Sequence, residues 1–140
     1  MRVALIHYWL IDFRGGEKTL KAISDIFPQS DIYAHVIDAS LVARVFPNHR
    51  VTPTFISRLP FAKRLYQNYL PLMPFALEQL DLRKYDLVIS SESGPAKGVL
   101  TSSDARHICY CHTPMRYIWD LYPAYAKECC RRGSAPCSRR

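Results

Sequence analysis

The chain has 140 residues, of which 49% are hydrophobic and 22% are charged, a composition typical of one globular domain with its own core. No apolar run reaches the roughly 18 residues that a membrane span needs, and the N-terminus lacks the features of a signal peptide, so we expect a cytoplasmic protein. The formal net charge is +7, but the last fourteen residues carry +4 of it and leave +3 for residues 1–126. This distribution disfavours nucleic-acid binding, which needs a basic surface across the domain.

The last fourteen residues differ sharply in composition from the rest of the chain. Residues 127–140 show no hydrophobic period and contain three of the five cysteines. The spacing of these cysteines fits no zinc pattern, and an odd count without a secretory signal argues against a disulfide framework. We expect one domain over residues 1–126, followed by a disordered tail that arises from a frame shift or an artificial truncation.

The first part of the chain predicts a strand, a loop and a helix. Residues 2–8 are apolar on both faces of a strand, which is typical of a central strand in a parallel sheet. Residues 9–16 predict a loop, and the helix begins at Glu17 and ends at Pro28. Glu17 and Lys21 have the spacing of an ion pair along the helix. Four apolar residues recur at helical spacing and are expected to face the sheet, namely Leu20, Ile23, Ile26 and Phe27.

Gly15 and Gly16 stand immediately before this helix. Glycines there let the backbone approach a ligand closely and leave free N–H groups at the helix N-terminus, an arrangement that binds phosphate. A plain tight turn is the alternative interpretation. The pair is not the G-x-G-x-x-G fingerprint, and no acidic residue follows a second strand in the expected way, which disfavours a nicotinamide-dependent oxidoreductase.

Two further strands and a short helix follow. Residues 31–37 predict the second strand, and residues 39–46 predict a helix with Asp38 as its N-cap. Residues 51–56 predict a weaker third strand, which belongs at an edge of the sheet because Pro53 interrupts it.

Residues 57–82 have a different pattern, in which apolar and aromatic residues alternate with basic ones. Prolines divide this segment into two short helices. Two interpretations remain open. The helices pack on the sheet with solvated basic faces, which the residues alone favour, or residues 58–77 form an aromatic and basic patch that contacts anionic lipid.

The position of a binding site is predicted from two apolar runs, residues 85–90 and 106–111. They are typical of buried parallel strands, and each delivers a polar loop at its carboxyl end, where ligands bind in open α/β sheets. The first loop carries Glu92, which could orient a substrate hydroxyl, and Lys97, which could face an anion; either could equally be a surface residue or a cap. His112 follows the second strand directly, where polar groups converge on a ligand.

A metal site near the second run is disfavoured. Cys109 and Cys111 project to one face of a strand while His112 turns away, so ligation by all three is strained and structural cysteines are favoured. No metal or other cofactor is expected. Residues 115–122 predict a helix that continues from this turn and carries Arg116.

Four stretches together resemble the N-terminal domain of the large family of retaining GT-B glycosyltransferases (family 4, group 1 type), which includes many mannosyltransferases and other sugar transferases of bacterial polysaccharide assembly. They are Arg2–Trp9, Arg14–Lys18, Tyr85–Gly98 and Cys111–Asp120. The resemblance covers residues 1–126, and the last two stretches together are specific.

The resemblance implies the N-terminal half of a GT-B fold, with a Rossmann-like parallel sheet flanked by helices. It implies transfer of a hexose from a nucleotide-sugar to a glycan or lipid-linked glycan, with retention at the anomeric carbon and without a metal. Mannose from a guanosine diphosphate donor is our guess within that class. By position, Gly15 and Gly16 would approach the donor phosphates or the acceptor, and His112 would contact the donor sugar as the catalytic residue.

The remaining expectations concern binding and partners. Glu92, Lys97 and Arg116 are our further candidates for contacts with donor or acceptor. Because many acceptors of this family are lipid-linked, the resemblance raises the case for peripheral contact of residues 58–77 with the inner face of the membrane.

The resemblance also implies parts that this sequence lacks. The second domain of the family, with its nucleotide-binding residues and paired glutamates, is missing, as are the later strands of the first domain. We therefore expect this chain to be inactive alone and to expose an apolar sheet edge. The alternative function is a non-catalytic binding module that pairs with a separate donor-binding chain.

Overall fold

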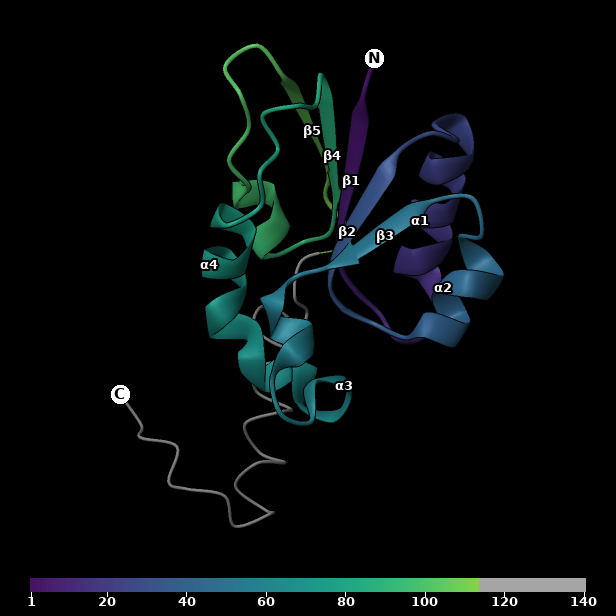
Figure 1. The fold of residues 1–140 in the computed structure, drawn as a ribbon, viewed down its shortest axis with the longest axis vertical. Helices are drawn as coiled ribbons and strands as arrows, with labels where there is room; N and C mark the ends of the chain where they lie inside the picture. Colours follow the sequence, from purple (N-terminus) through teal and green to yellow (C-terminus); the bar gives the residue numbers. More distant parts are fainter. Residues whose placement is uncertain (114–140) are drawn as a thin grey trace.

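The computed structural model describes residues 1–113, which form a five-stranded parallel sheet flanked by helices (Figure 1). The strand order is β3-β2-β1-β4-β5. The predicted α/β, Rossmann-like sheet is thereby confirmed. The predicted domain end at residue 126, the helix 115–122 and the tail 127–140 lie outside the described residues. The strands are β1 (Val3–Leu10), β2 (Asp31–Ile37), β3 (Arg50–Pro53), β4 (Leu87–Ser91) and β5 (Arg106–Tyr110).

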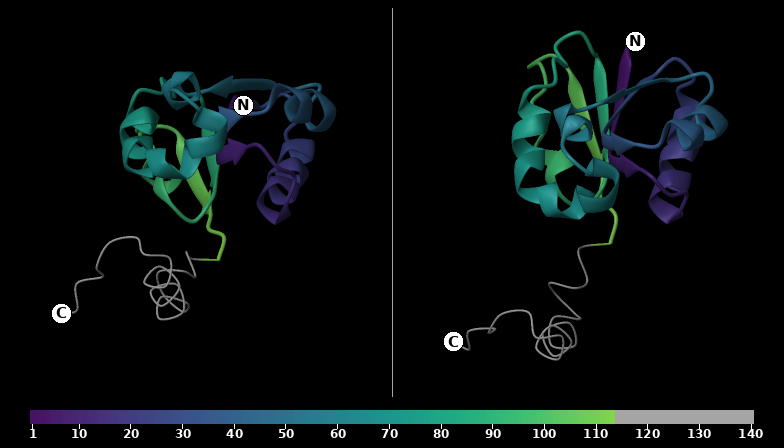
Figure 2. Two further views of the ribbon diagram at one scale, coloured as in Figure 1. Left: turned by 90° about the horizontal axis from the view of Figure 1, so that it is seen from below. Right: turned by 60° about the horizontal axis from the view of Figure 1, so that its bottom comes forward.

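Helices cover both faces of the sheet (Figures 1 and 2). Helices α1 (Gly15–Ile26) and α2 (Ala39–Val45) close one hydrophobic cluster over β1, β2 and β4. Two further clusters lie on the opposite face, under α4 and several shorter segments. The elements on this second face are η1 (Phe55–Arg58), α3 (Ala62–Leu65), η2 (Tyr66–Leu72), α4 (Met73–Glu78) and η3 (Pro95–Gly98).

The first strand is central, as its sequence predicts. It pairs with β2 on one side and with β4 on the other. Leu5 belongs to the cluster under α1 and α2, whereas Ala4 and Ile6 belong to a cluster on the other face, and all three are fully buried. Because the connections that leave β1 and β4 run to opposite sides of the sheet, the carboxyl ends of these two strands flank a crevice, the usual ligand position in such sheets.

Helix α1 begins at Gly15, two residues before the predicted start. Leu20 is fully buried, as predicted, but Ile26 is 70% exposed, so its predicted position against the sheet is wrong. Ile26 lies six residues after Leu20, which places it about 120° away around a helix of 3.6 residues per turn. Ser24, one turn after Leu20, takes the inward position instead and is fully buried.

The predicted ion pair between Glu17 and Lys21 is also wrong. The Lys21 ammonium contacts the Asp25 carboxylate one turn further along α1. Glu17 turns away from its own helix face toward His7 on β1. Glu17 thus pairs with His7 on β1 and not with Lys21 on its own helix, and this contact forms part of the site described below.

Asp38 caps α2, as predicted. Its carboxylate accepts hydrogen bonds from the backbone N–H groups of Ser40 and Leu41, at 3.0 and 3.2 Å. The Lys63 ammonium lies 2.8 Å from the same carboxylate and, with the Ser40 hydroxyl and the Leu41 N–H, holds the pKa of Asp38 well below its usual range. Lys63 is therefore tied to the body of the domain.

The segment that follows β3 forms four short helical pieces where two helices were predicted. Prolines end or begin several of them, since proline cannot donate the helical hydrogen bond. Phe61, the N-cap of α3, has a φ of 53°, in the left-handed region that a bulky residue rarely adopts. Its ring is 70% exposed. The backbone here is held in a strained form that presents an aromatic ring to solvent.

The outer strand β5 is exposed, as the resemblance leads one to expect. Ile108 and Tyr110 are 54% and 51% exposed on the face that α1 and α2 cover elsewhere. Cys109 and Cys111 are free and exposed, which contradicts the structural role predicted for them. Cys109 lies on the edge strand β5 and Cys111 directly follows it, and both are exposed among residues 1–113.

Candidate functional site

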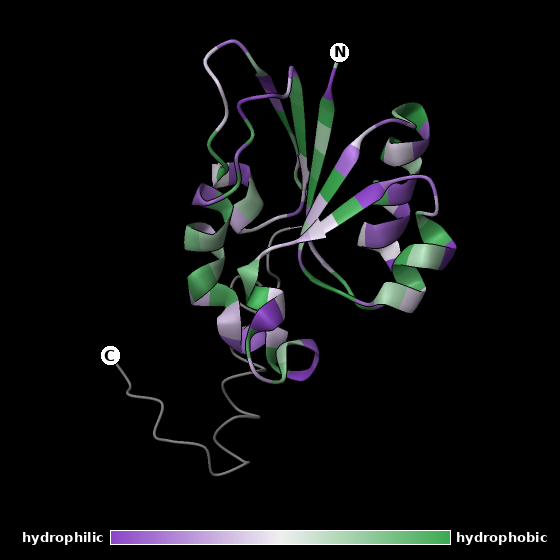
Figure 3. Cartoon of the chain, viewed as in Figure 1, coloured by the Kyte–Doolittle hydropathy of each residue, from purple (hydrophilic) through white to green (hydrophobic). Residues whose placement is uncertain are grey.

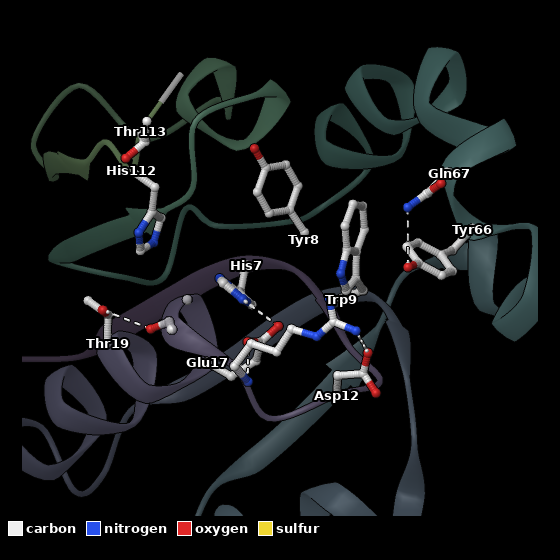
Figure 4. Close-up of a pocket in the computed structure, with 13 residues that line it drawn as sticks. His7, Tyr8, Trp9, Asp12, Glu17, Thr19, Tyr66, Gln67, His112 and Thr113 are labelled. Atoms are coloured by element: carbon white, nitrogen blue, oxygen red, sulfur yellow. Dashed lines mark hydrogen bonds and ion pairs between the residues drawn. The ribbon is translucent and has the colours of Figure 1, made fainter. Parts of the chain in front are cut away.

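A cleft of about 590 Å³ opens at the carboxyl end of β1, between the start of α1 and the end of the chain that the structure describes (Figure 4). This volume falls within the range of about 300–1,000 Å³ typical of small-molecule sites. Its walls combine imidazoles, aromatic rings, a charged pair and the paired glycines. The lining residues are His7, Tyr8, Trp9, Asp12, Arg14, Gly15, Gly16, Glu17, Thr19, Tyr66, Gln67, His112 and Thr113.

The paired glycines form the first turn of α1 and line the cleft. The first N–H groups of a helix lack partners within the helix and carry its positive partial charge. A Cβ placed on Gly15 would meet no atom within 4 Å among the described residues, apart from its chain neighbours and the backbone of α1. Residues 1–113 therefore leave the space beside Gly15 open to a ligand.

Gly16 has a different neighbour. A Cβ there would lie 3.4 Å from Cε1 and 3.7 Å from Nε2 of His7. The glycine thus lets α1 pack directly against the imidazole of β1. A Cβ at this position would already be in van der Waals contact with the imidazole, so a larger side chain has little room there.

His7 is held from two sides at the bottom of the cleft, and Figure 4 shows one of these contacts, the one with Glu17. Its Nδ1 lies 2.6 Å from the carbonyl oxygen of Ser91, which can only accept, so Nδ1 carries the hydrogen and donates it. The opposite nitrogen, Nε2, lies 3.8 Å from Oε1 of Glu17. Both side chains are buried. Desolvation would raise the pKa of Glu17, but its contacts with His7 and with backbone N–H groups prevail and lower it.

His112 reaches the same cleft from the end of β5. Its Nε2 lies 3.0 Å from the hydroxyl of Ser91, and its ring is 6.4 Å from that of His7. Desolvation, assisted by the neighbouring His7, lowers the pKa of His112, which favours its neutral form. Ser91 therefore contacts both imidazoles, one through its carbonyl and one through its hydroxyl. A neutral imidazole beside an open cleft can accept or donate a proton.

The structure brings three of the predicted site residues together and places the others elsewhere or outside the described residues. Gly15, Gly16 and His112 come together, although they are far apart in the sequence. Glu92 does not line the cleft: it is fully buried and its carboxylate accepts the backbone N–H of Ala96 at the start of η3. This is the cap that the sequence left open as an alternative.

The other two candidates lie elsewhere. Lys97 is exposed on η3, outside the lining of the cleft. Arg116 lies outside the described residues. Within residues 1–113, no group of three or more His, Cys, Asp or Glu side chains is placed to hold a metal ion.

The sequence analysis missed one whole wall of the cleft. The rings of Tyr8 and Trp9 stack at 4.8 Å, and Trp9 meets Tyr66 at 4.5 Å with the planes tilted by 59°. Gln67 Nε2 lies 3.3 Å from the Tyr66 hydroxyl. The position of Tyr8 at the carboxyl end of the first strand was a usable signal, the same one that identified His112. Nothing in the local sequence predicts that η2 completes the wall.

Comparison of this chain with models of protein families, with curated proteins and with solved structures finds no significant match to any of them.

Proposed function

We propose that this chain is the acceptor-side part of a retaining glycosyltransferase, which transfers a hexose from a nucleotide-sugar to a glycan or lipid-linked glycan. Donor binding is completed by a second domain, on the same or another polypeptide. Mannose remains our choice of sugar. The single observation that supports the proposal best is the convergence of Gly15, Gly16 and His112 on one cleft at the carboxyl ends of the strands.

The chemistry of the cleft is suited to such a reaction. A nucleoside diphosphate leaving group gathers negative charge as the bond to the sugar breaks, and a helix N-terminus offers N–H donors and a positive partial charge to it. His112 is placed to contact the sugar from the opposite wall. No metal or other cofactor is part of this proposal.

The test of the proposal is nucleotide-sugar binding to the 140-residue chain with Gly15→Ala as the probe. We expect guanosine diphosphate mannose to shift the backbone amide signals of Gly15, Gly16 and Thr19 in heteronuclear NMR spectra. Because a Cβ at position 15 meets no other segment among the described residues, Gly15→Ala should fold like the parent chain and yet bind at least about tenfold more weakly, a loss of 1.4 kcal/mol.

Gly98→Ala is the matched control. Gly98 lies in η3, and a Cβ there also meets nothing within 4 Å. It should bind the nucleotide-sugar as the parent does. Equal binding by the parent and by Gly15→Ala would remove α1 from the site and would leave the proposal without its main support.

A non-catalytic module that binds a ligand and pairs with a donor-binding chain is the second candidate. It is supported by the exposed apolar edge at β5, which a further domain can cover. The two candidates separate when the chain is assayed with its donor-binding partner. Sugar transfer supports the enzyme, and ligand binding without transfer supports the module.

We further propose that residues 58–77 contact the inner face of the membrane. No helix among the described residues is long and apolar enough to cross a bilayer. This segment nevertheless exposes Phe61 and, less fully, Leu65, Leu72 and Phe75, beside the exposed Arg64. Figure 3 shows hydrophilic and hydrophobic residues alternating along α3 and its neighbours. Apolar side chains together with basic ones are typical of contact with anionic lipid.

Liposome flotation tests the membrane contact. The double variant Phe61→Ser/Arg64→Ser should bind vesicles of phosphatidylglycerol at least about tenfold more weakly than the parent, since a basic residue near the surface alone contributes about 1 kcal/mol. Lys63 is left unchanged because it pairs with Asp38. The control is Ile26→Ser/Arg50→Ser. Ile26 is also 70% exposed, but on α1. Equal flotation of both double variants would exclude a role of this segment.

A further inference from the structure

One wall of the cleft is a row of three aromatic rings that contact one another, and the first of them is held by a hydrogen bond to the backbone. Figure 4 shows Tyr8, Trp9 and Tyr66 side by side, with Gln67 at the end of the row. The Tyr8 hydroxyl accepts the backbone N–H of Ser93 at 3.0 Å and lies 2.8 Å from its hydroxyl. Rings held in this way lose little conformational freedom on binding, so their contact area contributes to affinity at low entropic cost.

The polar groups beside this wall carry no net charge. The Arg14 guanidinium and the Asp12 carboxylate lie 3.0 Å apart at the opening of the cleft. A phosphate at this end would meet the Asp12 carboxylate as well as the guanidinium. A neutral ligand with several hydroxyl groups meets no such repulsion, because a carboxylate accepts and a guanidinium or amide donates hydrogen bonds to them.

The shape of the wall distinguishes a sugar from a planar base. A nucleobase stacks best on an open flat ring face. Here one face of Trp9 is covered by Tyr8, and Tyr66 stands at 59° to Trp9, so the surface between them is angled. A puckered pyranose, with apolar C–H groups on one face and hydroxyls at its rim, fits an angled aromatic surface bordered by an amide.

We propose that Trp9, Tyr66 and Gln67 form a carbohydrate subsite, which takes a neutral hexopyranose unit of the acceptor. This inference rests on the proposed function and specifies its acceptor side. The rings would pack on the C–H face of the sugar, and the Gln67 amide would hydrogen-bond its hydroxyls. Tyr66 and Gln67 begin η2, within the segment 58–77. The sugar would thus lie between the exposed apolar patch and the start of α1. In a lipid-linked acceptor bound this way, the lipid would face the patch and the reacting end of the sugar would face α1.

Saturation-transfer NMR on the 140-residue chain tests the subsite. The probes are the methyl α-glycosides of mannose, glucose and galactose, with adenosine and guanosine as planar competitors. We expect at least one glycoside to receive saturation through its ring C–H protons. Tyr66→Ala should weaken its binding at least about tenfold, and Tyr66→Phe, which keeps the ring, should change it by less than about threefold.

Two more variants make the outcome decisive. Gln67 is exposed, so Gln67→Ala should fold even where Tyr66→Ala does not, and it should weaken glycoside binding several-fold. Ile26→Ala removes an exposed apolar side chain of α1 outside the cleft and should bind as the parent does. The proposal is overturned when no glycoside binds, when Tyr66→Ala and Gln67→Ala bind like the parent, or when only the nucleosides bind in a Tyr66-dependent way.

The failures of the two proposals are distinguishable. The glycosides carry neither phosphate nor nucleoside, so their binding is independent of the nucleotide-sugar titration. Glycoside binding without nucleotide-sugar binding would support a lectin-like module, whereas nucleotide-sugar binding without glycoside binding would leave the glycosyltransferase proposal standing without this subsite.

Discussion

Replacing His112 by alanine is expected to lower sugar transfer at least about 100-fold, the lower end of what a positioned acid–base or polar catalytic group contributes. The assay requires the chain together with its donor-binding domain. His112 lines the cleft, contacts Ser91 and is biased toward the neutral form by the desolvation that lowers its pKa. A neutral imidazole can exchange a proton or hydrogen-bond the sugar near neutral pH.

The control for this prediction is His107→Ala. His107 lies on the same strand, but its Nε2 is 2.9 Å from the Ser90 hydroxyl and it does not line the cleft. This variant should retain transfer within a few-fold of the parent. Unchanged transfer in His112→Ala would remove His112 from the catalytic site, and an equal loss in both variants would indicate damage to β5 instead.

The parent protein is expected to lose about 3 kcal/mol of stability as the pH rises and buried Glu92 ionises, since each unit of pKa shift corresponds to 1.36 kcal/mol. Replacing Glu92 by glutamine is expected to remove this loss. Burial raises the pKa of Glu92 from 4.5 to about 7, although the backbone N–H groups of Ala96 and Gly94 oppose the shift. The folded state therefore binds a proton that the unfolded state releases between pH 4.5 and pH 7. The contribution of Glu92 to stability is full below pH 4.5 and is lost as the pH rises to 7.

A second buried group has the opposite dependence. Burial lowers the pKa of His35 from 6.5 to about 4, so the unfolded state binds the extra proton in that range and stability rises with pH. Between pH 4.5 and pH 6.5 the contributions of Glu92 and His35 largely cancel. In Glu92→Gln the free energy of unfolding should consequently rise with pH across this window, and in His35→Asn it should fall.

Denaturant titrations at pH 4.5, 5.5, 6.5 and 8 measure these slopes. Relative to the parent, the free energy of unfolding of Glu92→Gln should be about 3 kcal/mol higher at pH 8 than at pH 4.5. Glutamine keeps the acceptor for the Ala96 N–H, so the comparison isolates the charge. Parallel pH profiles for parent and variant would show that Glu92 titrates normally in the folded protein.

Much of the fold was predictable because its signals are local. A first strand with apolar residues on both faces marks the centre of a parallel sheet, a proline marks the edge strand, and Asp38 marks the start of a helix. Each of these follows from the covalent structure of a few neighbouring residues, and the structure confirms all three. The same reasoning placed His112 just after a strand and the two glycines next to a helix N-terminus. The structure has His112 shortly after β5 and has Gly15 and Gly16 within the first turn of α1.

The errors concern choices between partners or positions that local spacing leaves open. Glu17 has a lysine one helical turn away, yet its carboxylate contacts His7 on β1. Glu92 has the sequence context of a ligand contact, yet its carboxylate accepts the backbone N–H of Ala96, four residues further along the chain. Helical spacing alone did not distinguish Ile26 from Ser24, since that choice depends on where the sheet lies.

The sequence by itself determined the order of the five strands along the chain and the helices α1 and α2, because hydrophobic period and turn chemistry act between near neighbours. Only the tertiary structure decided the composition of the cleft. Ser91 holds two imidazoles from different strands, and η2 brings Tyr66 against Trp9 across the loops that separate them. Such contacts arise from the parallel register of β1, β4 and β5 and from the packing of η2, which no stretch of the chain specifies alone.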